Sequence, residues 1–163
     1  CSINITAADL AVVRFPDDLL RMVEERGVDP ARLTLEITEQ ALLGDLDLAA
    51  RSLGRLRNAG MRIALDDFGA GFCNFGYLKY LPLDIIKLDR ILLDGVADNA
   101  RDRAVLRGVM AMARALDLEV VAEGIENEAQ RRIAEEEGCA AYQGFLRAKP
   151  LTQEDFLKLA EKS

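Results

Sequence analysis

The 163-residue chain contains no histidine. It therefore cannot build an imidazole general base, a Ser-His or Cys-His nucleophile, or a histidine-ligated zinc site. Cysteine is also scarce: Cys1, Cys73 and Cys139 are odd in number, lie far apart and form no CxxC pair. This spacing argues against a disulfide framework and favours a reducing cytosol.

Long hydrophobic runs are absent as well. No apolar stretch is long enough to span a bilayer and no signal peptide is visible, so we expect a cytoplasmic chain, whose parent protein could still be membrane-anchored. The sequence lacks an initial Met and opens on an apolar, strand-like run, Ser2-Ile3-Asn4-Ile5. Because domains seldom start in mid-strand, we expect a piece of a longer protein.

Positive charge is in deficit. The 21 Lys and Arg residues face 28 Asp and Glu residues, which gives a formal net charge of −7. This balance argues against binding to a DNA or RNA polymer or to a membrane surface. An anionic ligand would need bound cations to offset the charge of the protein. Length and composition are those of one globular domain, with half of the residues hydrophobic and 30% charged.

Short β-rich runs alternate with longer amphipathic stretches. The predicted strands cover 3–5, 33–37, 62–65, 85–88, 120–122 and 140–143. The predicted helices cover 7–25, 46–58, 101–116, 126–137 and 153–161, the last with Thr152 as its N-cap. Six strands alternating with helices predict an α/β fold with a parallel sheet and right-handed crossovers. No GxGxxG or P-loop motif is present, which weakens a nucleotide-fold interpretation.

Polar residues follow the apolar strands at or near their C-terminal ends. In chain order these residues are Asn4, Glu36, Glu39, Asp66, Asp67, Lys87, Glu123, Glu126 and Gln143. The carboxyl ends of strands form the edge where (β/α) barrels and open α/β sheets build their active sites. We therefore expect these side chains to converge on one site.

The acids in this set are hard oxygen donors. Glu36, Asp66, Asp67 and Glu123, with the carbonyl oxygen of Asn4, suit Mg²⁺, Mn²⁺ or Ca²⁺ better than zinc or copper. Converging carboxylates would repel one another, and two divalent ions would neutralise them. Adjacent aspartates could serve both ions, and a metal pair about 3.5–4 Å apart is the usual device for in-line phosphodiester hydrolysis.

Each of these residues also has a purely structural interpretation. Asn4 could make a strand-end hydrogen bond, and the run Asp66-Asp67-Phe68-Gly69 could be a turn with an Asx cap. Lys87 could pair with a neighbouring carboxylate for stability alone. Glu39 and Glu126 could be first-turn acids that favour the helix dipole. These interpretations do not explain why successive strands end in the same way.

Six motifs in order resemble the EAL-domain family, the bacterial phosphodiesterases of cyclic di-GMP. The motifs are Ser2-Ile3-Asn4-Ile5-Thr6, Leu35-Glu36-Ile37-Thr38-Glu39, Leu65-Asp66-Asp67-Phe68-Gly69, Ile86-Lys87-Leu88-Asp89-Arg90, Val121-Ala122-Glu123-Gly124-Ile125-Glu126 and Gln143-Gly144-Phe145. The resemblance implies a TIM-type (β/α) barrel with one antiparallel strand. Residues 1–163 would be the C-terminal two-thirds of that single domain, an incomplete barrel of about six βα units without the family's first strand.

The resemblance also implies an activity, the hydrolysis of cyclic di-GMP to linear pGpG with two bound Mg²⁺ or Mn²⁺ ions, and Ca²⁺ is expected to inhibit. It implies that Asn4, Glu36 and Asp66 bind the first metal. Asp67 would help to hold the second metal, with Asp66 bridging. Glu123 would belong to the metal site or act as general base.

Further roles come from the same resemblance. Lys87 would orient the attacking water, Glu39 would brace the loop after Asp67, and Gln143 would line the site, with Glu126 in support. The residues implied in catalysis are Lys87, Glu123 and Asp67. The implied partners are cyclic di-GMP, a second copy of the chain in a homodimer, and an upstream GGDEF or sensor domain in the parent protein.

Two departures from the family pattern leave alternatives open. No Glu-Ala-Leu tripeptide occurs in the chain, and its Glu would be another ligand of the first metal. Ala70 stands where the family usually has Thr, and Phe72-Cys73-Asn74 stand for Tyr-Ser-Ser. We therefore expect the isolated chain to be impaired. The alternative is a degenerate module that binds cyclic di-GMP or a protein partner without turnover.

A third possibility is an enolase-like enzyme with Mg²⁺ and a lysine base. The adjacent pair Asp66-Asp67 and the ending Gln143-Gly144-Phe145 argue against it.

Overall fold

The computed structural model describes residues 1–71 and 75–160. The strands are β1 (Ser2–Ile5), β2 (Thr34–Thr38), β3 (Arg62–Phe68), β4 (Ile85–Leu88), β5 (Glu119–Ala122) and β6 (Ala141–Tyr142). The helices are α1 (Ala7–Leu10), α2 (Phe15–Glu25), α3 (Leu46–Asn58), α4 (Phe75–Tyr80), α5 (Ala100–Ala115), α6 (Glu128–Glu137) and α7 (Gln153–Ala160). Three short 3₁₀ turns are η1 (Pro30–Arg32), η2 (Glu39–Leu42) and η3 (Arg90–Leu92).

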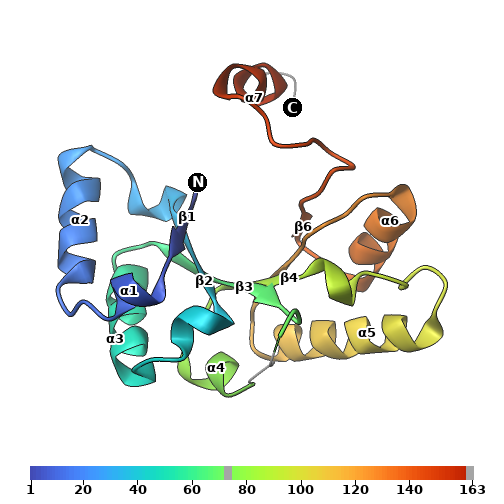
Figure 1. The fold of residues 1–163 in the computed structure, drawn as a ribbon, viewed down its shortest axis with the longest axis horizontal. Coiled ribbons are helices and arrows are strands. Elements are labelled where there is room, and N and C mark those ends of the chain that lie inside the picture. The colour runs from blue at the N-terminus through green and yellow to red at the C-terminus, as the bar shows by residue number, and fades with distance from the viewer. Residues whose placement is uncertain (72–74, 161–163) are drawn as a thin grey trace.

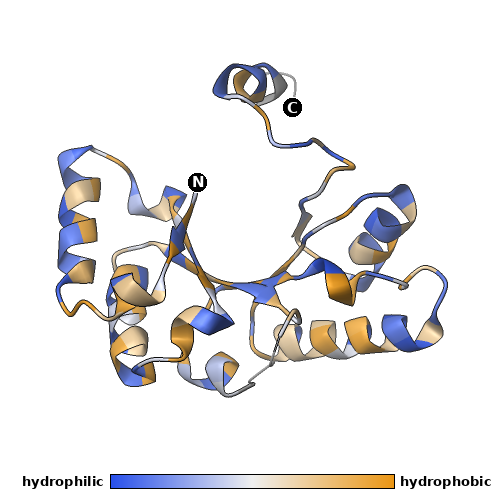
Figure 2. Ribbon diagram, in the orientation of Figure 1, coloured by the Kyte–Doolittle hydropathy of each residue, from blue (hydrophilic) through white to orange (hydrophobic). Residues whose placement is uncertain are grey.

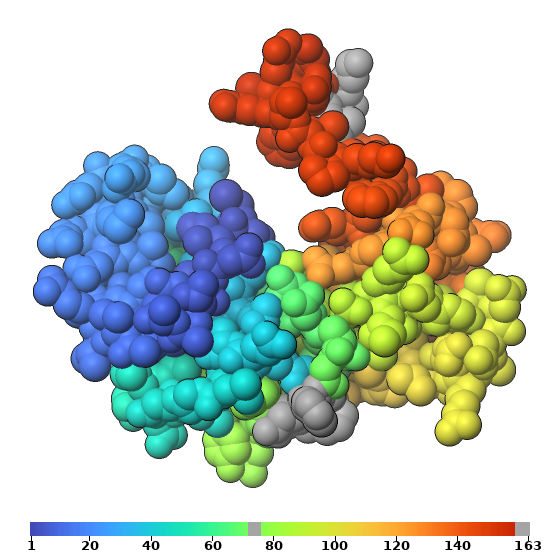
Figure 3. Space-filling model, viewed as in Figure 1, coloured from blue at the N-terminus to red at the C-terminus, as the bar shows by residue number. Residues whose placement is uncertain are grey.

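The six strands form one sheet in chain order, from β1 to β6. Every neighbouring pair is parallel, which confirms the predicted parallel sheet. The antiparallel strand implied by the resemblance is therefore not among these six. The sheet is open within the described residues, because no pairing joins β1 to β6 (Figure 1). The space-filling view shows the molecule hollowed between its N-terminal and C-terminal segments (Figure 3).

Helices cover one face of the sheet. In Figure 1, α3, α4 and α5 lie along the same side of the strands, while α7 stands apart on the other. Alternate strand residues point to the helix-covered face, and Leu35, Ile37 and Ile86 on that face are fully buried. Residues between them, such as Glu36, point to the open face. Among the described residues, no helix has both the length and the apolar character needed to cross a membrane.

The prediction of one helical stretch over 7–25 is wrong, because the structure divides it into α1 and α2. Thr6 begins α1 with a capping box that includes Asp9. Pro16 lies in the first turn of α2. Proline is tolerated there because its missing N–H has no partner in a first turn, whereas inside a continuous helix it would remove a hydrogen bond.

Local capping decides the other helix ends. The prediction for α3 is confirmed at both ends, with Asp45 accepting a hydrogen bond from the N–H of Leu48. Helix α6 begins at Glu128 rather than at residue 126, because Asn127 is its N-cap. Thr152 accepts a hydrogen bond from the N–H of Asp155, as predicted. Residue 161, where the last predicted helix ends, lies outside the described residues.

Gly144 sits where the chain leaves β6 and passes close to Ile125. A Cβ at this glycine would lie 2.1 Å from the Ile125 carbonyl oxygen and 2.4 Å from its nitrogen. Since backbone atoms cannot swing away as a flexible side chain can, we expect Gly144→Ala to lower the free energy of unfolding by about 1–3 kcal/mol. Urea denaturation measures this change.

The matched control is Gly108→Ala, in the exposed face of α5, where an added Cβ meets nothing within 4 Å. It should stabilise the protein by about 0.5–1 kcal/mol, because alanine is the better helix former. Equal effects of the two variants would show that the contact of Gly144 with Ile125 does not constrain the fold.

Candidate metal and catalytic site

Lys87 lies at the centre of the predicted site. Its Nζ is 3.0 Å from Glu36 Oε2, 2.9 Å from Asp66 Oδ1 and 2.9 Å from Glu123 Oε1. Its three partners come from β2, β3 and the residue after β5, so the parallel sheet itself brings these side chains together. The side chain of Lys87 is only 9% exposed. Asn4 lies opposite Glu36 in the β1–β2 register, which places it at the margin of the group.

A bulge in β3 allows two adjacent aspartates to serve one site. Between the paired positions Leu65–Ile86 and Phe68–Leu88, β3 contains Asp66 and Asp67 whereas β4 contains only Lys87. Side chains of successive strand residues normally point to opposite faces. Here Asp67 adopts a left-handed backbone conformation with φ 55°, and its N–H donates to Asp66 Oδ1 at 3.0 Å. The extra residue and this conformation re-aim the second carboxylate.

The result is a cluster of acids suited to a metal ion. Carboxylate oxygens of Asp66, Asp67 and Glu123 all lie within 4.8 Å of one another. Figure 2 shows the hydrophilic stretch where β3 ends. An all-oxygen set of this kind fits Mg²⁺, Mn²⁺ or Ca²⁺. The predicted convergence of strand-end acids is thus consistent with the positions of Asp66, Asp67 and Glu123. It is also consistent with the position of Glu36, which contacts Lys87.

For both Lys87 and Glu123, burial shifts the pKa in one direction and the hydrogen bond between them shifts it in the other. Burial alone would lower the pKa of the Lys87 ammonium, but its three carboxylate partners outweigh burial and raise that pKa. Burial raises the pKa of Glu123, the hydrogen bond from Lys87 lowers it, and the charge of Asp66 raises it again, with a net increase. Partial burial and the charges of Asp66 and Asp89 raise the pKa of Asp67. Excess negative charge therefore remains at this site.

Metal affinity should consequently depend on pH. A protonated carboxylate is a poor ligand, and the pKa values of Asp67 and Glu123 are raised above the ordinary 3.8 and 4.5. We expect Mn²⁺ affinity to fall as the pH drops, with the loss beginning above pH 4.5. Calorimetric titrations with Mn²⁺ over a pH series measure this. Affinity that stays constant down to the ordinary carboxyl pKa would contradict the assignment of these ligands.

Two of the predicted supporting residues lie outside the cluster. Glu126 pairs with Arg90 at 2.5 Å, and its N–H donates to the side chain of Gln130. Gln143 is exposed and lines a groove of about 740 Å³ with Phe145 and other residues of the C-terminal segment. The structure thus places both at the rim of the sheet, without bringing either into the carboxylate group.

Glu39 occupies an unusual position beside the β3 turn. Both of its carboxylate oxygens are buried, and neither has a hydrogen-bond partner among the residues that the structure describes. It lines a cavity of about 420 Å³ together with Asp67, Ala70 and Tyr77. The resemblance implies that Glu39 braces this loop, and the alanine at position 70 has no hydroxyl to offer it. The departures at Phe72-Cys73-Asn74 lie outside the described residues.

Asp89 belongs to one of the six motifs but is not among the predicted site residues. It caps η3 by accepting the N–H of Ile91 at 2.8 Å, and its charge contributes to the raised pKa of Asp67. Its place two residues after Lys87, just past the end of β4, is the signal that could have identified it.

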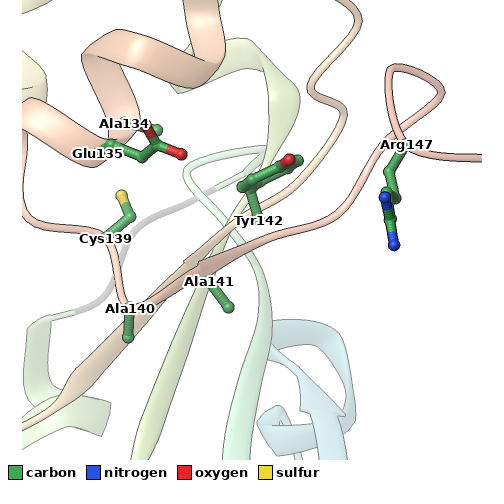
Figure 4. Close-up of a pocket in the computed structure, with 7 residues that line it drawn as sticks. All are labelled: Ala134, Glu135, Cys139, Ala140, Ala141, Tyr142 and Arg147. Carbon is green, nitrogen blue, oxygen red and sulfur yellow. The ribbon is translucent and has the colours of Figure 1, made fainter. Parts of the chain in front are cut away.

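A separate hollow of about 380 Å³ lies beside edge strand β6 (Figure 4). It is lined by Cys139 and Tyr142 among others, and the N–H of Cys139 donates to the carbonyl of Ala134 in α6. Burial and the charge of Glu137 raise the pKa of the Cys139 thiol to about 11. The thiol is thus protonated at neutral pH, which argues against a nucleophile in this hollow.

The family model described as EAL domain matches residues 1–150. An uncharacterized protein of Mycobacterium tuberculosis is 38% identical over 152 residues. In Pseudomonas aeruginosa, "Cyclic di-GMP phosphodiesterase NbdA" is 36% identical over 160 residues, and "Bifunctional diguanylate cyclase/cyclic di-GMP phosphodiesterase MucR" is 34% identical over 156. The alignments cover 93%, 96% and 96% of this chain, but only 24%, 20% and 23% of those proteins.

Solved structures are similar over nearly all of the chain. The EAL domain of Mycobacterium smegmatis DcpA has a TM-score of 0.92 and 34% identity, covering 99% of this chain and 72% of that one. Klebsiella pneumoniae BlrP1 has a TM-score of 0.83 and 29% identity in a manganese/cyclic di-GMP complex, covering 91% of this chain and 38% of that one. A calcium complex of BlrP1 matches equally well.

Proposed function

Because this chain belongs to the EAL family and carries six parallel strands of its (β/α) barrel fold, we propose that it hydrolyses cyclic di-GMP to linear pGpG as part of a larger metal-dependent phosphodiesterase. We assign residues 1–163 to the C-terminal two-thirds of one barrel domain. The observation that carries the proposal is the convergence of Asp66, Asp67 and Glu123 beside Lys87 at the strand ends.

The acids would hold the divalent ions. Asp66, Asp67 and Glu123 supply the oxygens that lie within 4.8 Å of one another, and Glu36 and Asn4 stand next to them across β2 and β1. Mg²⁺ or Mn²⁺ bound there would supply hydroxide at neutral pH and stabilise the leaving oxygen.

The chain's own residues would then accept the proton of the attacking water and neutralise charge on the phosphate. Water adds to one phosphorus of cyclic di-GMP and the bond to the 3′ oxygen breaks, which leaves a 5′-phosphate and a 3′-hydroxyl. The raised pKa of Glu123 suits a group that accepts the proton of that water. The Lys87 ammonium would orient the water and offset negative charge on phosphate oxygens. Asp67 holds its carboxylate toward the site through the β3 bulge.

The test is turnover of cyclic di-GMP with Mg²⁺ and with Mn²⁺ by the parent protein, compared with residues 1–163 alone. Formation of linear pGpG by the parent would support the proposal. Little hydrolysis is expected from residues 1–163, because the family's Glu-Ala-Leu glutamate is not among them. Intact substrate in both reactions would contradict a phosphodiesterase.

A second candidate function is binding of cyclic di-GMP or a protein partner without hydrolysis. The observation that favours it is the buried Glu39 carboxylate, which has no partner within the described ranges and stands beside Ala70. Without a hydrogen bond from Glu39 to support it, the segment that follows Asp67 would position a second metal poorly. Equilibrium dialysis that shows bound but intact cyclic di-GMP would favour this candidate, whereas failure to bind would exclude it for the cyclic dinucleotide.

We further propose that residues 1–163 alone form a homodimer. Among the described residues the sheet has two open edges, β1 and β6, and apolar side chains such as Phe156 and Leu157 on α7 are exposed. Open edges and apolar faces favour association. Sedimentation velocity should show a dimer, and a monomer that binds no apolar dye would contradict this. In the parent protein, an upstream GGDEF or sensor domain would accompany the barrel.

A further inference from the structure

We infer that Lys87 is an internal counter-cation that competes with the metal. In the metal-free protein its ammonium would occupy the carboxylate group, and a divalent ion would have to take Asp66 and Glu123 from it. The inference rests on the proposed function, and it names the residue that sets metal affinity at that site.

The hydrogen-bonding capacity of Lys87 is fully used. An ammonium group has three N–H donors, and three carboxylate oxygens lie 2.9–3.0 Å from Nζ. No donor is left over for water or for a phosphate oxygen. If Lys87 is to orient water in the reaction, at least one of these ion pairs must first be released.

A metal ion at this site would bind two of the same carboxylates. Asp66 and Glu123 belong both to the three ion pairs of Lys87 and to the acidic cluster that fits a divalent ion. Asp67 is the exposed member of that cluster, and within the described ranges no ion pair joins it to Lys87. An entering ion would therefore meet Asp67 first and then draw Asp66 and Glu123 away from the ammonium.

Repulsion between the carboxylates explains why the metal-free site needs an internal cation. Oxygens of three acids crowd within 4.8 Å of one another, and without a cation their mutual repulsion would drive them apart. Lys87 keeps two of these acids, and Glu36, in place. With a divalent ion bound there, Lys87 would no longer be needed to neutralise these acids, and its ammonium could face substrate. Metal binding and the availability of Lys87 would thus be coupled.

The test is calorimetric titration of Mn²⁺ into the wild-type chain, Lys87→Met and Lys79→Met. Methionine keeps a similar length and removes the charge. Lys79 is an exposed lysine of α4 that lies over the ring of Tyr80, so Lys79→Met controls for net charge. Lys87→Met should bind Mn²⁺ about tenfold more tightly than the wild type, a coupling of ordinary size, whereas Lys79→Met should bind as the wild type does.

The outcomes separate this inference from the proposed function. Tighter binding by Lys87→Met, including binding where the wild type shows none, supports the inference. Binding by the wild type with equal or weaker binding by Lys87→Met overturns the inference and leaves the metal site intact. No binding by any of the three proteins overturns the inference, whereas the proposed function is decided separately by the turnover assay on the parent protein.

A second measurement uses only the wild type, in case Lys87→Met does not fold without metal. Acetic anhydride labelling followed by mass spectrometry reports how accessible each lysine amine is. Lys87 should react slowly in the metal-free protein and several-fold faster with saturating Mn²⁺, while Lys79 in the same digest stays constant. Unchanged or slower labelling of Lys87 on addition of Mn²⁺ would overturn the inference.

Discussion

Asp66→Asn should reduce turnover of cyclic di-GMP by the parent protein about a thousandfold or more, because it removes the central charge of a metal site. Asp66 belongs to the acidic cluster, pairs with Lys87 and accepts the N–H of Asp67. Asparagine keeps the size and one carbonyl oxygen, so the Asp67 hydrogen bond can persist. The loss would thus report on the charge of Asp66 and not on the shape of the bulge.

The measurement combines two assays on each variant. Formation of linear pGpG gives the turnover rate, and Mn²⁺ titration gives the metal affinity, which should fall together with the rate. Asp47→Asn makes the same chemical change at an exposed position in the first turn of α3, and it should leave both quantities unchanged. Activity retained by Asp66→Asn would remove this residue from the metal site.

Phe68→Ala should have the largest effect on stability and should also weaken the metal site. Phe68 is only 2% exposed and pairs with Leu88 directly after the bulge. Its carbonyl accepts the N–H of Asp89 at 3.0 Å. Burying this ring anchors the far end of the bulge. Its truncation should cost about 3–5 kcal/mol of the free energy of unfolding and lower the affinity for Mn²⁺.

Two controls separate stability from site geometry. Leu53→Ala removes a fully buried side chain from α3 and should cost about 2–5 kcal/mol, with the Mn²⁺ affinity of the folded protein unchanged. Phe68→Leu should cost much less than the alanine variant and keep the affinity. If Phe68→Ala and Leu53→Ala bind Mn²⁺ equally well, then Phe68 does not anchor the bulge. Urea denaturation and calorimetry supply both readouts.

The sequence alone was sufficient for features set by local chemistry. Alternating β-rich and amphipathic runs predicted the parallel sheet and the bounds of α3, and the N-cap Thr152 predicted where α7 begins. It also placed acids at the strand ends. These features depend on residues that are close in the chain, so pattern and spacing contain the necessary information. The single helix predicted over 7–25 was wrong, because Pro16 lies in the first turn of a separate helix, α2.

Only the tertiary structure decided how the site is assembled. Strand alternation would send Asp66 and Asp67 to opposite faces, and their convergence depends on the register of β3 against β4 and on the left-handed conformation of Asp67. Lys87 contacts acids from three separate strand ends, which no sequence spacing specifies. The buried, unpartnered state of Glu39 within the described residues depends likewise on packing. Register and packing depend on residues distant in the chain, whereas helix caps and strand patterns are encoded locally.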